Sequence, residues 1–82
     1  MKLPRNIRPE TLASLLSRYG YRVTRQTGSH MRLTSDSRGF EHHITIPRYT
    51  ALRIGTLGAI LSEVASYRDV HKQQLVQELF GR

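Results

Sequence analysis

The chain has 82 residues, which is enough for one small domain, and we expect a single domain over residues 1–82. The absence of cysteine excludes disulfide bonds and Cys-ligated zinc sites. Its apolar stretches are much shorter than a signal-peptide core or a membrane-spanning helix. We therefore expect a soluble, cytoplasmic protein with no membrane association.

The charge of the chain is strongly basic and unevenly distributed. Thirteen Lys and Arg residues against six Asp and Glu give a net charge of +7. Residues 1–53 hold ten basic and three acidic side chains, so they carry the whole excess, whereas residues 54–82 are neutral. Such a surface favours an anionic partner, with nucleic acid first and an acidic protein second. A solvated basic face that only aids solubility is the alternative.

Apolar residues at helical spacing predict a first helix over residues 9–19. Pro9 lies in its first turn, and Gly20 stands where a left-handed residue would end it. The stripe that would face the core has the spacing i, i+3, i+4, i+7 and consists of Leu12, Leu15, Leu16 and Tyr19.

Three runs of alternating polarity, at residues 21–25, 29–34 and 40–46, predict an antiparallel three-stranded meander. A three-residue loop, 26–28, would set Gly28 in a left-handed conformation and place Arg22 opposite Arg32. Across the second turn, Arg32 would pair with His43 and His30 with Thr45. Side-chain alternation then buries one face, made of Tyr21, Val23, Met31, Leu33, Ile44 and Ile46. The open face would carry Arg22, Thr24, His30, Arg32, Thr34, His43 and Thr45.

Two more helices are predicted after the sheet. Helical spacing recurs over residues 57–64, with Thr56 as a cap, and Asp69 would cap a third helix that carries apolar residues over 75–80. The expected fold is therefore α+β, with helices on one face of the sheet.

The order of one helix, three strands and further helices resembles the double-stranded RNA-binding fold. Four short pieces, in one order, are similar to the HicA (YcfA-like) toxins, and the similarity extends from about residue 12 to residue 64. These pieces are Gly20-Tyr21, Gly28-Ser29-His30, Ile46-Pro47-Arg48, and Gly55-Thr56-Leu57 with Ile60-Leu61. One departure is Tyr49, which stands where the family commonly has a histidine.

The resemblance implies a toxin that cleaves messenger RNA, with a HicB-type antitoxin as partner and His30 at the position of the family's essential histidine. The chemistry of the residues agrees with this, because histidine can take the proton of an RNA 2′-hydroxyl or protonate the leaving oxygen, and neither step requires a metal or cofactor. His43 is the candidate for a second acid or base. Arg22, Arg32 and Arg48 are candidate phosphate ligands. Gly28 and Ser29 would support the turn before His30.

Other functions remain open at this point. A non-catalytic RNA-binding module of the double-stranded type would leave His30 dispensable. A DNA-binding helix-turn-helix over residues 56–80 ranks last, because that region carries few cations. His42 and His43 are adjacent on a strand and point to opposite faces, so they do not predict a metal site.

Overall fold

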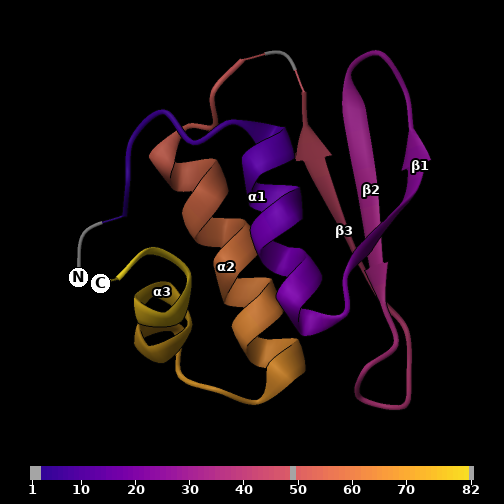
Figure 1. Ribbon diagram of the computed structural model, residues 1–82, viewed down its shortest axis with the longest axis vertical. Coiled ribbons are helices and arrows are strands. Elements are labelled where there is room, and N and C mark those ends of the chain that lie inside the picture. The colour runs from indigo at the N-terminus through magenta and orange to yellow at the C-terminus, as the bar shows by residue number, and fades with distance from the viewer. Residues whose placement is uncertain (1–2, 49, 82) are drawn as a thin grey trace.

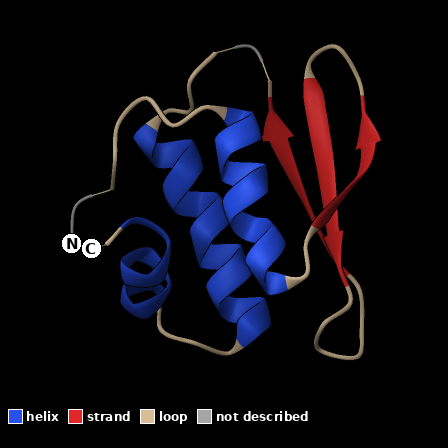
Figure 2. Ribbon diagram, viewed as in Figure 1, coloured by secondary structure: helices blue, strands red, loops and turns tan. Residues whose placement is uncertain are grey.

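A computed structural model describes residues 3–48 and 50–81. The elements in chain order are α1 (Pro9–Leu16), the 3-10 helix η1 (Ser17–Tyr19), β1 (Arg22–Gln26), β2 (His30–Ser35), β3 (His42–Pro47), α2 (Ile54–Arg68) and α3 (Lys72–Phe80). The strands form one antiparallel sheet in the order β1-β2-β3, α1 and α2 cover one of its faces, and α3 packs beside α2 (Figure 1, Figure 2). The predicted α+β fold is confirmed. The narrower likeness to the double-stranded RNA-binding fold stays a prediction.

The first helix follows its sequence pattern closely. Pro9 occupies its first turn, where a missing N–H is no loss, and Glu10 lies at the positive end of the helix dipole. Its last turn tightens into η1, and Gly20 ends it with φ +83° in the left-handed region. The predicted helix over 9–19 is confirmed as α1 followed by η1.

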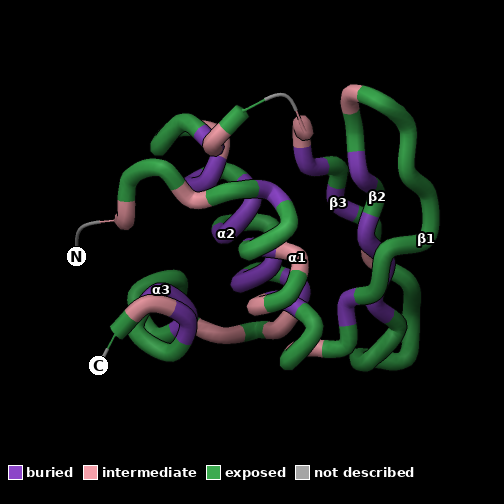
Figure 3. The backbone as a smooth tube through the Cα atoms, turned by 45° about the horizontal axis from the view of Figure 1, so that its top comes forward, coloured by how far each residue is buried: buried purple, intermediate pink, exposed green. Residues whose placement is uncertain are grey.

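The hydrophobic core lies between the helices and the covered face of the sheet (Figure 3). Every layer supplies fully buried side chains, namely Leu12, Leu16, Leu33, Ile46, Leu57, Leu61, Val64 and Leu75. Burial of each Leu or Ile contributes about 1.5–3 kcal/mol, so these contacts hold the sheet against the helices. They leave the other face of the sheet, the open face, available to solvent.

The predicted pairing of β1 with β2 is wrong by two residues. Arg22 lies opposite Thr34 and Val23 opposite Leu33, and the register then shifts so that Arg25 lies opposite Arg32. This shift is a β-bulge, which inserts one unpaired residue into β1. Val23 is 47% exposed rather than buried, because β1 is an edge strand that extends beyond the helices (Figure 1).

The predicted pairing of β2 with β3 is also displaced by two residues. His30 lies opposite Pro47, Arg32 opposite Thr45 and Thr34 opposite His43. The turn between these strands, which contains Gly39 at φ +88°, is longer than the sequence pattern indicated because β3 begins at His42. The alternation of faces survives, since a shift of two residues keeps each side chain on its side.

Two predicted helix caps are wrong. Helix α2 begins at Ile54 after Arg53, so Thr56 lies inside its first turn. Asp69 has φ +57° and ends α2 in a left-handed conformation, whereas His71 precedes α3. None of the helices in the described part of the chain has the length and apolar character needed to cross a membrane.

Candidate active site

The turn between β1 and β2 is closed by a threonine side chain. Thr27 Oγ1 accepts the N–H groups of Ser29, at 3.3 Å, and of His30, at 3.0 Å. The Thr27 N–H in turn donates to the His30 carbonyl at 2.9 Å. Threonine commonly bonds nearby backbone in this way, and here it fixes the backbone position at which His30 enters β2.

The expected left-handed conformation of Gly28 is wrong. Positive φ values among the described glycines occur at Gly20 and Gly39, and a Cβ atom added at Gly28 would meet no atom within 4 Å. The Thr27 hydroxyl accepts the N–H groups of Ser29 and His30, so the turn does not need a left-handed residue to satisfy these donors. Gly28 is therefore an open surface position beside His30 rather than a conformational requirement.

The exposed His30 imidazole is oriented by its neighbour in sequence. Ser29 Oγ lies 2.9 Å from His30 Nδ1. When Nδ1 carries the proton and donates to this oxygen, the lone pair of the neutral ring is on Nε2, which suits a general base. When the hydroxyl donates instead, Nε2 carries the proton and suits a general acid. The contact with Ser29 is therefore compatible with His30 acting as a general base or as a general acid.

Arg48, which directly follows β3, holds the turn. Its Nη1 donates to the Thr27 carbonyl at 2.6 Å, and its backbone N–H donates to the Ser29 carbonyl at 2.9 Å. Its Nε lies 3.9 Å from Glu10 Oε2, which connects the turn to α1. The structure thus joins Arg48 to the predicted site, where it contacts protein backbone at the turn.

His43 lies at the far end of the β2–β3 pair from His30. It is paired with Thr34, four residues along β2 from His30, a separation of about 13 Å in a strand. Its Nδ1 lies 2.8 Å from Thr34 Oγ1 and 3.4 Å from a nitrogen of Arg32, which can only donate. Its Nε2 lies 3.4 Å from Glu41 Oε1. This geometry places His43 outside reach of a phosphodiester bound at His30.

Three arginines gather beside His43 on the open face of the sheet. Arg22, Arg25 and Arg32, which we call the arginine cluster, line one shallow hollow together with Thr24, Thr34 and His43. Arg22 and Arg32 were expected on this face, whereas Arg25 reaches it through the bulge. Arg32 lies two residues from His30 on the same face of β2, so the hollow and the turn are neighbouring parts of one basic surface.

His42 belongs to an aromatic cluster on the helical side. Its Nδ1 lies 2.7 Å from the Tyr21 hydroxyl, and its ring stacks on Tyr67 at 4.9 Å between centroids. Burial and then the neighbouring Tyr67 raise the pKa of the Tyr21 phenol well above its ordinary value, so Tyr21 is neutral at physiological pH. The described residues contain no group of three His, Cys, Asp or Glu side chains that could hold a metal ion.

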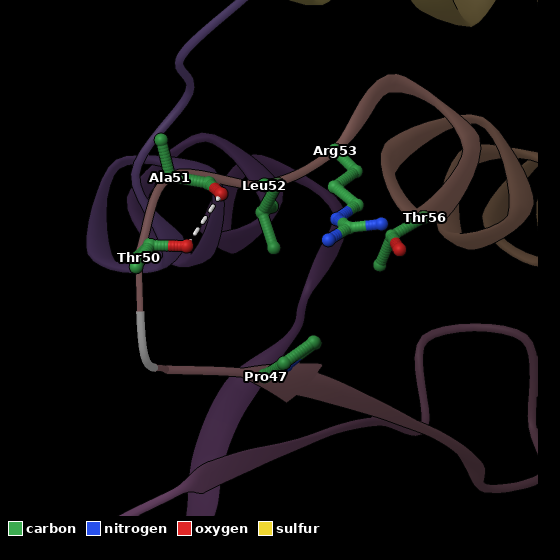
Figure 4. A pocket seen from close by; sticks show the side chains of 6 residues that line it. All are labelled: Pro47, Thr50, Ala51, Leu52, Arg53 and Thr56. Carbon is green, nitrogen blue, oxygen red and sulfur yellow. Dashed lines mark hydrogen bonds between the residues drawn. The ribbon is translucent and has the colours of Figure 1, made fainter.

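A second hollow lies between the end of β3 and the start of α2 (Figure 4). Pro47, which pairs with His30, forms one wall, and Arg53 and Thr56 form the other. The segment between them includes Tyr49, the position at which the family resemblance places a histidine; Tyr49 lies outside the described residues.

The family model of the HicA toxins of bacterial toxin-antitoxin systems matches residues 9–65, which include α1, the whole sheet and most of α2. The chain belongs to the HicA toxin family. It is therefore the toxin of a toxin–antitoxin pair and has an antitoxin as partner. No individual curated protein and no solved structure shows significant similarity to the chain.

Within this HicA fold, the structure divides the expected site residues into two groups. Gly28, Ser29, His30 and Arg48 meet at the turn, whereas Arg22, Arg32 and His43 meet in the hollow. The sequence pattern did not single out two further residues beside these groups, Thr27 and Arg25. Thr27 carried a usable signal, since a hydroxyl just before Gly-Ser is typical of a side-chain-closed turn. Arg25 carried none, because the bulge that turns it does not show in the residue pattern.

Proposed function

We propose that this HicA toxin is a metal-independent endoribonuclease that cleaves messenger RNA in the cytoplasm, with His30 as its acid–base residue. The observation that carries the proposal is the exposed imidazole of His30, oriented by Ser29 at the edge of a basic surface, in a chain of the HicA family. RNA differs from DNA by the 2′-hydroxyl, which is the group such an imidazole can activate.

In the proposed reaction, neutral His30 takes the proton of a 2′-hydroxyl through Nε2 while Nδ1–H donates to Ser29. The 2′-oxygen then bonds to the adjacent phosphorus, and the bond from phosphorus to the 5′-oxygen breaks. The leaving 5′-oxygen takes a proton from water, and the products are a 2′,3′-cyclic phosphate and a 5′-hydroxyl. Arg32 is the candidate to stabilise the charge on the phosphoryl oxygens, because it lies on the same face of β2 as His30.

We propose a HicB-type antitoxin as the partner of this toxin. A protein that covers the turn at residues 27–30 would block access to His30, and an acidic surface on it would match the basic open face.

The test compares wild type with His30→Ala on a single-stranded RNA and on DNA of the same sequence, in EDTA. His71→Ala is the matched control, because His71 is also exposed and makes no side-chain cap contact. We expect wild type and the control to cleave RNA only, and His30→Ala to lose at least about 100-fold in rate. RNA cleavage that survives in His30→Ala, or cleavage of the DNA, contradicts the mechanism.

The same assay separates the proposal from a non-catalytic RNA-binding module. Such a module would bind the RNA without cutting it, and His30→Ala would leave both binding and growth of the host unchanged. We expect instead that expression of the wild type arrests growth and that His30→Ala relieves the arrest.

A further inference from the structure

The bulge in β1 turns a third arginine onto the open face. Arg22 and Arg25 are three residues apart and would point to opposite faces of a regular strand. The register shift between Val23 and Arg25 changes this, and both residues line the same hollow as Arg32. Thr24, the bulged residue, is fixed there by a 2.8 Å hydrogen bond to Thr34. The bulge is therefore a defined part of the sheet that brings Arg25 directly opposite Arg32.

The arginine cluster has little compensating negative charge. Glu41 is the carboxylate that lines the hollow, and it lies 3.4 Å from His43. Among residues 3–48 and 50–81, no carboxylate comes within 4.0 Å of a guanidinium nitrogen of the arginine cluster. Like charges directly opposite each other destabilise an antiparallel pair. An anion bound between Arg25 and Arg32 would remove that repulsion.

We propose that the arginine cluster also binds the RNA backbone beside the scissile phosphodiester, about one or two nucleotides along the strand, with Arg32 nearest to the scissile phosphate and Arg25 as the contact that the bulge adds. This inference rests on the proposed function, because it takes the RNA cleaved at His30 as the ligand. The hollow is lined by three arginines, and guanidinium forks suit the unesterified oxygens of a phosphate. Arg32 is about 7 Å along β2 from His30 and Thr34 about 13 Å, so a strand of RNA that follows β2 spans both places.

An acidic protein surface is the competing ligand for such a cluster, but the position of the cluster favours RNA. The hollow continues the surface that carries His30, so any single strand that extends beyond the scissile phosphate in this direction must pass over it. Full binding then requires an RNA long enough to contact both the turn and the arginine cluster. An oligonucleotide with a single phosphodiester that occupies the turn at residues 27–30 reaches Arg32 at most and does not contact Arg25.

Binding of 2′-O-methyl RNA, which lacks the reactive hydroxyl, tests the inference without cleavage. We compare an oligonucleotide of about eight nucleotides, a length within the range of a short single-strand site, with a dinucleotide, whose single phosphodiester can occupy the turn alone. The variants are Arg25→Gln and Arg25→Lys. Arg5→Gln is the control, because it removes one exposed positive charge from the segment before α1, away from the sheet. Thermal unfolding of each variant shows that the fold is retained.

We expect Arg25→Gln to weaken binding of the longer oligonucleotide by about fivefold to tenfold and to leave the shorter one unchanged. The slope of log affinity against log salt concentration should fall by about 0.7, the value for one phosphate contact on a single strand. Arg25→Lys should keep the salt slope but lose part of the affinity, and Arg5→Gln should match wild type.

Equal weakening by Arg25→Gln and Arg5→Gln overturns the inference, because it shows an effect of net charge alone. Unchanged RNA binding by Arg25→Gln together with lost binding of the antitoxin overturns it in favour of an acidic protein ligand. Both outcomes are independent of cleavage. If His30→Ala still cleaves RNA while Arg25→Gln weakens binding as expected, the proposed mechanism fails and the phosphate site stands.

Discussion

At the residue scale, the position of the His30 imidazole depends on two neighbouring hydroxyl groups. Thr27 fixes the backbone of the turn through the N–H groups of Ser29 and His30, and Ser29 then orients the ring through Nδ1. Arg48 supports the same turn through two carbonyl oxygens. Since all of these contacts act on protein atoms, their removal should change the rate of the chemical step more than the affinity for RNA.

We expect Thr27→Val to lower kcat for RNA cleavage by about tenfold with little change in KM. Valine has nearly the shape of threonine but cannot accept the two backbone N–H groups of the turn. Thr27→Ser keeps the hydroxyl and should recover most of the rate. Steady-state kinetics of the three proteins test this. A rise in KM with constant kcat would show instead that Thr27 contacts the RNA.

At the scale of single elements, three glycines in turns have different reasons to be glycine. Gly20 and Gly39 have positive φ, but a Cβ atom at Gly20 would also lie 3.1 Å from Ser35 Oγ, whereas Gly39 is open. Gly28 has neither constraint. Positive φ costs a residue with a side chain about 1–2 kcal/mol.

We expect replacement by alanine to destabilise the protein in the order Gly20, Gly39, Gly28. Gly20→Ala should cost about 2 kcal/mol because strain and crowding add, and Gly39→Ala about 1 kcal/mol. Gly28→Ala should be neutral or stabilise by about 0.5 kcal/mol, since it restricts the unfolded chain. Urea unfolding of the three variants measures the order. A large loss of stability in Gly28→Ala would show instead that Gly28 has the left-handed conformation expected from the sequence pattern.

The contact between η1 and α3 should make stability depend on pH. The Tyr19 hydroxyl donates to Glu78 Oε1 at 2.6 Å, and this hydrogen bond, with a second one from Gln74, lowers the pKa of Glu78. Burial and the same hydrogen bond raise the pKa of Tyr19 to about 12. A lowered carboxylate pKa adds stability that is present above the ordinary value, about 4.3, and is lost as the pH falls through the folded value.

Tyr19→Phe removes the donor and keeps the ring under the Arg68 guanidinium. We expect the variant to be less stable than wild type near neutral pH, and the difference to shrink as the pH falls below the ordinary carboxyl pKa of about 4.3 and through the lowered pKa of Glu78. Melting temperatures over a pH series test this. A difference that stays constant with pH would show that packing, rather than the carboxylate, accounts for the change.

At the scale of the whole molecule, Tyr67 joins the helices to the sheet at the end remote from His30. Its hydroxyl donates to the Phe40 carbonyl at 2.6 Å and accepts the Arg38 N–H at 3.0 Å, while its ring packs against Tyr21 and His42. Tyr67 thereby fixes the long β2–β3 turn to α2. The proposed catalytic turn lies at the opposite end of the same sheet.

We expect Tyr67→Phe to lower the free energy of unfolding by about 1–3 kcal/mol, because partly buried backbone groups lose their partner. Its cleavage rate at a temperature where it is fully folded should equal that of wild type. Unfolding curves and RNA cleavage measured on the same preparation check both statements. A reduced rate in a folded variant would show that the two ends of the sheet are coupled.

The elements were predictable because each depends on local pattern, as with the stripe of Leu12 and Leu16 in α1 and the alternation around Leu33 in β2. The registers were not predictable. The β1–β2 register depends on the bulge at Thr24 and on a turn closed by the Thr27 side chain, and the β2–β3 register depends on a turn longer than the residue pattern indicated. His30 was placed correctly on the open face. His43 was placed on the correct face but opposite the wrong residue. A shift of two residues keeps a side chain on its face and changes the residue with which it pairs.

The bulge in β1 also affects how the chain behaves at high concentration. Strand β1 is one edge of the sheet, and a regular edge strand offers free N–H and C=O groups to the edge of another molecule. The unpaired residue at Thr24 interrupts this row, and Arg22 and Arg25 on either side add like-charge repulsion between two such edges. A variant with Thr24 deleted would have a continuous edge, and we expect it to aggregate more readily than wild type.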